Sequence, residues 1–138
     1  MKNEVTLKIV LPKIPDIELV ALEGLDRLAR HLGIAEEKIG EAKIIVTEAL
    51  INALEHAGVD NTGVHVEFTM TPKELSIFVR DHGKGFEPSS VEEPDLETKL
   101  GTMNKRGWGL QLMKSLSDDF HIESNSNGTT ITIKKLLS

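Results

Sequence analysis

The chain has 138 residues, a formal net charge of −6 and no cysteine, which excludes disulfide bonds and thiolate metal sites. A chain of this length is expected to fold as one domain, residues 1–138, that buries roughly two-thirds of its unfolded-chain surface. The acidic balance argues against direct nucleic-acid binding, and without an apolar run of ~20 residues or an apolar leader the chain is predicted to be cytoplasmic and free of the membrane.

The N-terminal part of the chain predicts one strand and two helices. Apolar residues alternate over residues 5–11, the pattern of a half-buried strand, and prolines follow. Apolar positions at helical spacing then run over residues 16–32, and Gly33 is a suitable residue to end that helix. A second, longer helix is predicted over residues 35–57 and stops at Gly58.

A row of polar side chains lies on the C-terminal half of the longer helix. Glu48, Asn52 and His56 are spaced four residues apart, so they follow one another along one face of the helix. The residues between them include the small Ala49 and Ala53. Two interpretations are open: a solvated outer face, or a polar row that holds a metal ion and its phosphates.

A β-hairpin is predicted next, with strands over residues 64–70 and 75–79. It ends in Asp81-His82-Gly83-Lys84-Gly85, a carboxylate followed by two glycines. Glycine permits a positive φ and the close approach of a ligand, but a plain glycine turn after a strand has the same appearance. His82 is interpreted as a solvent-facing side chain.

Residues 87–105 show no periodicity, which in a compact domain indicates a long functional loop or a disordered segment. Arg106-Gly107-Trp108-Gly109-Leu110 then opens a helix that is predicted to continue through Phe120. Free amides at a helix start favour phosphate, and Lys105 adds positive charge; an ordinary glycine start is the alternative. Two strands, 121–124 and 130–134, close the chain around the turn signal Asn127-Gly128.

These motifs, taken in order, resemble the histidine-kinase-like ATPase superfamily, also called GHKL. They are E-x-x-x-N-x-x-x-H on a helix, D-x-G-x-G after a strand, R-G-x-G-L opening a helix, and G-T-T before the last strand. The segments TEALINALEHA and GTTITIKKL are most similar to the anti-sigma-factor serine/threonine kinases. The resemblance implies a two-layer α/β sandwich with a Bergerat-type ATP-binding fold, in which a mixed, mainly antiparallel sheet carries helices on one face and its first strand lies at an edge.

The resemblance also implies the roles of individual residues toward ATP and Mg2+. Asn52 is expected to complete the shell of the magnesium ion, Glu48 to orient or deprotonate the attacking hydroxyl, and Arg106 to reach the γ-phosphate. Asp81 is expected to accept a hydrogen bond from the adenine amine. The remaining nucleotide contacts are assigned to Gly83, Gly85, Lys105, Gly107, Gly109, Leu110 and Thr130 or its neighbour Thr129, with an ATP lid over residues 87–106.

For such a kinase the implied partners are proteins. The expected function is ATP-dependent phosphorylation of an antagonist of the STAS anti-anti-sigma type, combined with binding of a sigma factor or a similar regulator, in a homodimer. A nucleotide-responsive binding module without kinase activity is the alternative. A detached histidine-kinase domain is disfavoured because no phosphoacceptor helix pair is present in the sequence.

Overall fold

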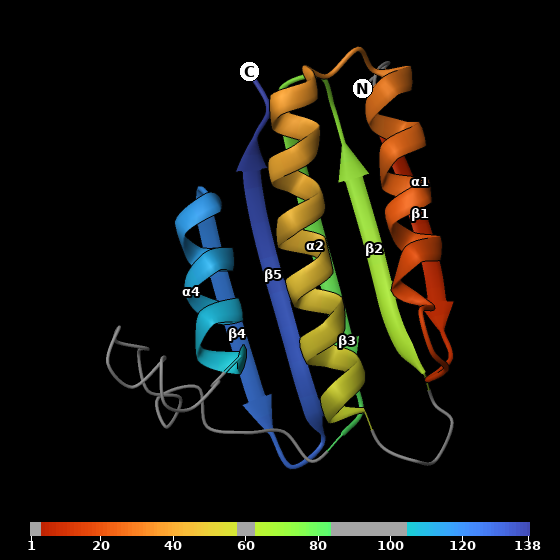
Figure 1. Ribbon diagram of the computed structural model, residues 1–138, viewed down its shortest axis with the longest axis vertical. Coiled ribbons are helices and arrows are strands. Elements are labelled where there is room, and N and C mark those ends of the chain that lie inside the picture. Colours follow the sequence, from red (N-terminus) through yellow and green to blue (C-terminus); the bar gives the residue numbers. More distant parts are fainter. Residues whose placement is uncertain (1–3, 58–62, 84–104) are drawn as a thin grey trace.

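The computed structural model describes residues 4–57, 63–83 and 105–138, with residues 105–108 described through their backbone alone (Figure 1). No helix in these ranges is long and apolar enough to cross a membrane. The elements in chain order are β1 (Val5–Leu11), α1 (Glu18–His31), α2 (Glu36–His56), β2 (Val64–Met70), β3 (Glu74–Asp81), α4 (Lys105–Leu116), β4 (Asp119–Asn125) and β5 (Gly128–Leu136).

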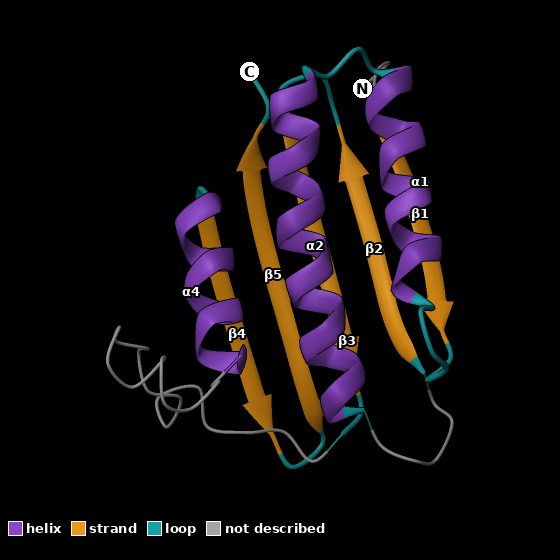
Figure 2. Ribbon diagram, viewed as in Figure 1, coloured by secondary structure: helices purple, strands orange, loops and turns teal. Residues whose placement is uncertain are grey.

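The strands form one sheet in the order β1-β2-β3-β5-β4, and β1 lies at an edge as predicted (Figure 2). All four pairings are antiparallel, so the mixed sheet implied by the resemblance is wrong for the part of the chain described here. Short connections account for two of the pairings, because β2 and β3, and β4 and β5, are joined by hairpin turns, which make strands antiparallel. The other two pairs are antiparallel as well, although helices lie between β1 and β2 and between β3 and β5 in the sequence.

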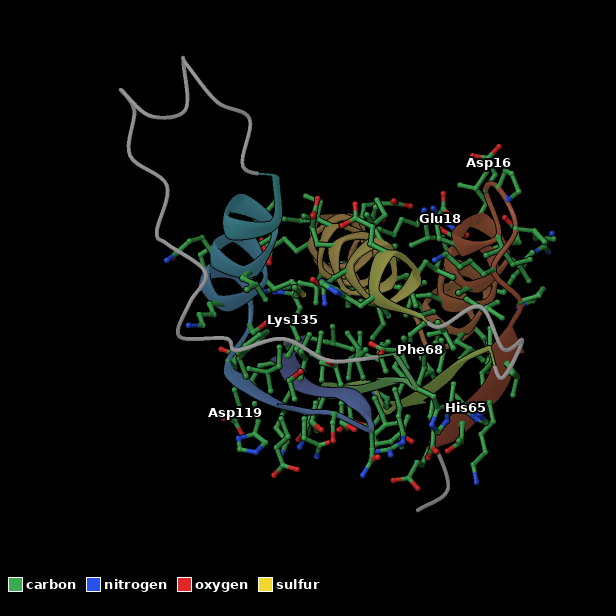
Figure 3. The ribbon with its side chains drawn as sticks, turned by 90° about the horizontal axis from the view of Figure 1, so that it is seen from below. Asp16, Glu18, His65, Phe68, Asp119 and Lys135 are labelled. Carbon is green, nitrogen blue, oxygen red and sulfur yellow. The ribbon has the colours of Figure 1, made fainter. Side chains whose placement is uncertain are left out.

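The helices cover one face of the sheet, and the core lies between the two layers (Figure 3). Strand alternation divides the side chains: Phe68 of β2 is fully buried under the helices, while His65 of the same strand lies on the open face. The longest helix, α2, lies centrally on this face, where small residues such as Ala49 and Ala53 are buried. The predicted two-layer sandwich is therefore confirmed.

The boundary between α4 and β4 differs from the prediction. The helix ends at Leu116, and Phe120, which was predicted to belong to the helix, pairs with Ile133 inside the sheet. After Leu116 the amide of Ser117 donates to the carbonyl of Lys114, three residues earlier, and the amide of Asp118 donates to Lys134 of β5, so the backbone has left the helix for the sheet. Apolar spacing alone does not distinguish the last turn of a helix from the first inward residue of a strand.

Candidate functional site

Four elements bring the predicted site residues to one end of the molecule. These are the C-terminal half of α2, the end of β3, the start of β5 and the N-terminal half of α4, at the lower end of Figure 1. They are far apart in the sequence, and the sheet register joins two of them directly, because Asp81 pairs with Thr129. The motifs read separately from the sequence therefore lie together.

The polar row of α2 is not a solvated face. Asn52 is only 7% exposed, and among the described residues its side-chain nitrogen Nδ2 has no hydrogen-bond partner. Glu48, one turn earlier, is half-buried. A buried amide group without a partner costs free energy, of the order of 1–3 kcal/mol, so its retention is typical of a site that awaits a ligand.

Glu48 lies directly against the glycine-containing helix α4. A Cβ atom built at Gly109 would lie 2.7 Å from Oε2 of Glu48, so a side chain at this position would require the Glu48 carboxylate, the flexible end of its side chain, to move away from α4. Burial raises the pKa of the Glu48 carboxyl, and the negative charge of Glu55 raises it further. The sequence analysis missed the influence of Glu55, although the two glutamates are two helical turns apart, which places them on similar faces of α2.

Asp81 is a buried carboxylate with one oxygen already used. It is 1% exposed; its Oδ1 accepts a hydrogen bond of 2.9 Å from the amide of Gly83. Among the described residues Oδ2 is buried without a hydrogen-bond partner. Burial raises the pKa of Asp81, while the amides of Gly83 and Thr129 oppose that rise. The free oxygen is therefore a buried acceptor ready for an N–H donor from a ligand.

Position 83 requires glycine because there is no room for a side chain there, and not because of an unusual φ angle. A Cβ atom there would lie 1.5 Å from the carbonyl oxygen of His56, at the end of α2. His56 thus holds the helix end against the segment that follows β3. Gly128, read from the sequence as a turn residue, has a φ of 136° and a Cβ position 2.1 Å from the carbonyl oxygen of Asp81. Both glycines allow backbones to approach closely around Asp81.

Of the two candidate threonines, Thr129 and not Thr130 faces the helices. Thr129 is 1% exposed, pairs with Asp81 and shares a 2.7 Å hydrogen bond between its hydroxyl and that of Ser124. Thr130 points to the opposite face, where its hydroxyl accepts a 2.9 Å hydrogen bond from Arg80. Because successive strand residues alternate between faces, Thr129 is the one of the two predicted threonines that lies on the same side of the sheet as Asp81.

The two glycines of the R-G-x-G-L motif, Gly107 and Gly109, lie inside α4 and not before it. Since α4 begins at Lys105, the amide of Gly107 is among the first N–H groups, which have no partner within the helix, whereas Gly109 lies beyond them. Gly109 therefore serves as the contact for Glu48 and not as an anion donor. Leu110 is 8% exposed and packs in the core.

Several predictions lie outside the described residues or side chains. Gly85 and residues 87–104 of the expected lid are not described, and the side chains of Lys105, Arg106 and Trp108 are likewise outside the description. His82 is described and does not simply face solvent: its ring packs edge-on against that of His65, with centroids 5.4 Å apart.

The described residues contain no group of three or more His, Cys, Asp or Glu side chains that suits a metal ion. A magnesium ion at Asn52 therefore has to arrive with ligands of its own, such as phosphate oxygens. The unpartnered atom of Asn52 is the nitrogen, but the two ends of an amide have the same shape and exchange by rotation about χ2. The oxygen is thus available to a hard cation.

Comparison with known proteins places these features in a wider group. Residues 16–135 match the family model of the histidine kinase-like ATPase domain. A serine-protein kinase RsbW of Bacillus licheniformis is 32% identical over 134 residues, which cover 92% of this chain and 83% of that protein. An anti-sigma F factor of Bacillus licheniformis is 28% identical over 142 residues, covering 100% of this chain and 95% of that protein.

A solved structure shows the same fold. The crystal structure of the RsbU and RsbW domains of a Mycobacterium tuberculosis protein superimposes with a TM-score of 0.70 at 18% identity. The match covers 96% of this chain and 32% of that longer chain, so the likeness concerns one domain of it.

Proposed function

Because the chain belongs to the family of histidine kinase-like ATPase domains, we propose that it is an ATP-dependent serine/threonine protein kinase that controls a regulator by partner switching. The observation that carries the proposal is the contact between Glu48 and Gly109, which sets a half-buried carboxylate beside the glycine-containing helix. A protein that only binds nucleotide has no need of a carboxylate there. The names of the relatives, serine-protein kinase and anti-sigma F factor, support the same function.

The proposed adenine end of the site is built around Asp81. Its free Oδ2 accepts the exocyclic amine of the base, and the buried Thr129 hydroxyl lies on the same side of the sheet. Burial excludes water, so the hydrogen bond to the base meets little competition from solvent. The requirement for a donor at this position favours adenine over guanine, which presents a carbonyl oxygen there.

The proposed phosphate end lies between α2 and α4. Asn52 is assigned to the magnesium ion that accompanies the triphosphate, and the free amides of the first turn of α4, including Gly107, to the phosphates. Bound magnesium supplies neutralisation of phosphate charge. Lys105 and Arg106 stay assigned to the phosphates by their place in the glycine motif.

Glu48 is the proposed catalytic base. Phosphoryl transfer needs a serine or threonine hydroxyl in line with the γ-phosphate, and a carboxylate that accepts its proton. The raised pKa of Glu48 makes it a better proton acceptor than an exposed glutamate. Gly109 has no side chain, so α4 leaves room for this carboxylate beside it.

Magnesium-dependent ATP binding is the first expected result. Calorimetric titration of the wild-type protein with ATP gives saturable binding with Mg2+ and much weaker binding in EDTA, and the single tryptophan, Trp108, provides a fluorescence check. The kinase reaction is then assayed with candidate antagonists of the STAS type. The proposal is contradicted if no ATP binding is detected at ATP concentrations up to about 1 mM. A Kd of about 1 mM corresponds to a binding free energy of only ~4 kcal/mol. Acid-labile phosphate on the product points instead to a histidine kinase.

The proposal includes a homodimer that forms through the region of β1. This strand is a sheet edge with unpaired backbone groups, and Val10 and the nearby Ile14 are 55% and 54% exposed. We expect sedimentation equilibrium at tens of micromolar protein to give the mass of two chains, and a Val10→Lys variant to shift the equilibrium toward one. A single-chain mass for the wild type contradicts the dimer but not the kinase.

The target regulator is proposed to be a sigma factor or a protein of similar role, and the circuit is proposed to be cytoplasmic. The anti-sigma F factor relative and the absence of cysteine from the sequence support these two points.

A further inference from the structure

Lys135 of β5 is a buried cation. It is 3% exposed, and its Nζ donates hydrogen bonds of 2.8 Å to Oε1 of Glu41 and 2.9 Å to the carbonyl oxygen of Leu116 (labelled in Figure 3). Lysine is almost never fully buried unless it is paired, because desolvation of an ammonium group is costly. A buried lysine that satisfies two acceptors on two different helices is therefore a specific connection between elements.

The two acceptors are suited to a cation. Leu116 is the last residue of α4, where free carbonyls and the helix dipole provide negative charge. Glu41 lies on α2, and its hydrogen bond to Lys135 lowers the pKa of the Glu41 carboxyl. The neighbouring Lys134 points to the open face and pairs with Glu74 at 3.3 Å, so it has no part in this connection.

Two of the contacts between α2 and α4 lie near opposite ends of α4. At one end, Lys135 joins Leu116 to Glu41; at the other, Gly109 packs against Glu48. Glu41 and Glu48 are two turns apart on α2, and Gly109 and Leu116 are two turns apart on α4. Since an α-helix rises ~1.5 Å per residue, the two contacts are ~10 Å apart along α2 and ~10 Å apart along α4. The two helices therefore meet at two points with the same separation.

We infer that Lys135 is a positioning residue for the phosphate end of the nucleotide site, acting through α4. Gly109 lies so near Glu48 that a Cβ atom there would lie 2.7 Å from Oε2, so a tilt of α4 changes the space available to that carboxylate and also moves the free amides of the first turn. Without Lys135, the C-terminal carbonyl of α4 loses its cation, and the apolar packing of Leu110 and Met113 alone resists a tilt of the helix. The turn after the helix stays attached to β5 through Asp118, whose amide donates to the Lys134 carbonyl at 2.9 Å, so the fold survives. This inference rests on the proposed function.

The test compares three variants with the wild type. Lys135→Met removes the cation at similar volume, and Lys134→Met is the matched control on the opposite face. Lys135→Met/Glu41→Met replaces the whole ion pair by apolar groups, which often restores stability. Neither variant of Lys135 can bond the Leu116 carbonyl. The double variant is therefore expected to recover stability without recovering the position of α4, so the comparison distinguishes the two roles of Lys135.

We expect affinity for Mg-ATP to fall about tenfold in both Lys135 variants, which corresponds to ~1.4 kcal/mol of weakened contact between the phosphates and the displaced amides of α4. The control keeps wild-type affinity. Amide hydrogen exchange across α4 is expected to be about tenfold faster in both Lys135 variants than in the control. All binding measurements are made well below each melting temperature, with folding verified by circular dichroism.

Two results overturn the inference. One is a double variant that recovers both its melting temperature and its ATP affinity. The other is a rate of amide hydrogen exchange across α4 that is the same in the Lys135 variants as in the Lys134→Met control. The first shows that Lys135 serves stability alone. If the wild type itself fails to bind ATP, the proposed function has failed, and the hydrogen-exchange comparison decides the helix-positioning role by itself.

Discussion

Replacing Asn52 with alanine is expected to weaken Mg-ATP binding about a hundredfold while the melting temperature changes by less than about 3 °C. Interactions with a charged group contribute ~1.5–3 kcal/mol, and about 3 kcal/mol corresponds to about a hundredfold in affinity. Stability behaves differently, because the substitution removes a buried amide nitrogen that has no partner in the described part of the chain, which offsets the lost packing. Affinity and stability therefore separate at this position.

Calorimetry with and without Mg2+ measures the first effect, and thermal unfolding measures the second. Ile51→Ala is the matched control, because Ile51 is the preceding residue of α2 and its side chain is 39% exposed. Full magnesium-dependent affinity in Asn52→Ala excludes the metal role assigned to this residue. A large loss of stability shows instead that Asn52 is a structural core residue.

Glu48→Gln is expected to reduce phosphoryl transfer by a factor of about 10²–10⁴ and to leave ATP affinity within about twofold of wild type. Glutamine preserves the shape that fits against Gly109 but does not accept the proton of the attacking hydroxyl. The assay is transfer of labelled phosphate to an antagonist protein at saturating ATP. Equal losses of binding and transfer contradict the division of roles between Asn52 and Glu48, and unchanged transfer favours a different base.

The pH dependence of transfer provides a second readout of Glu48. Only the deprotonated carboxylate accepts a proton, so the rate falls as the pH drops through the Glu48 pKa, which burial and Glu55 place above its ordinary value. Glu55→Gln removes one cause of that rise, so the acidic limb of the pH–rate profile moves to lower pH. A profile that is identical in the two proteins means that Glu55 does not influence the base.

The binding-module alternative is distinguished by the same set of measurements. It predicts magnesium-dependent ATP binding that Asn52→Ala removes, but no phosphate transfer by the wild type and no effect of Glu48→Gln. The partial burial of Glu48, which raises its pKa, counts against this alternative, since desolvation of a carboxylate without a role costs free energy.

Local patterns predicted most elements, with exceptions where two structures share a pattern. Period-two alternation located β1, β2 and β3, and helical spacing located α1 and α2. Phe120 was misplaced because an apolar residue four positions after Leu116 fits a helix as well as the start of β4. Residues 58–62 and 84–104, which include most of the expected lid, were predicted but are outside the described structure.

The sequence by itself determined which residues of the proposed site share a local pattern: Glu48 and Asn52 lie on one helical face, and Asp81 lies two residues before a glycine. Tertiary structure decided which atoms meet. Thr129 replaced Thr130 because strand register assigns the faces, Gly109 became the contact for Glu48, and Lys135 was revealed as a buried connection between helices. Such contacts depend on distances between elements that no local pattern encodes, so they appear only when the sheet and helices are packed together.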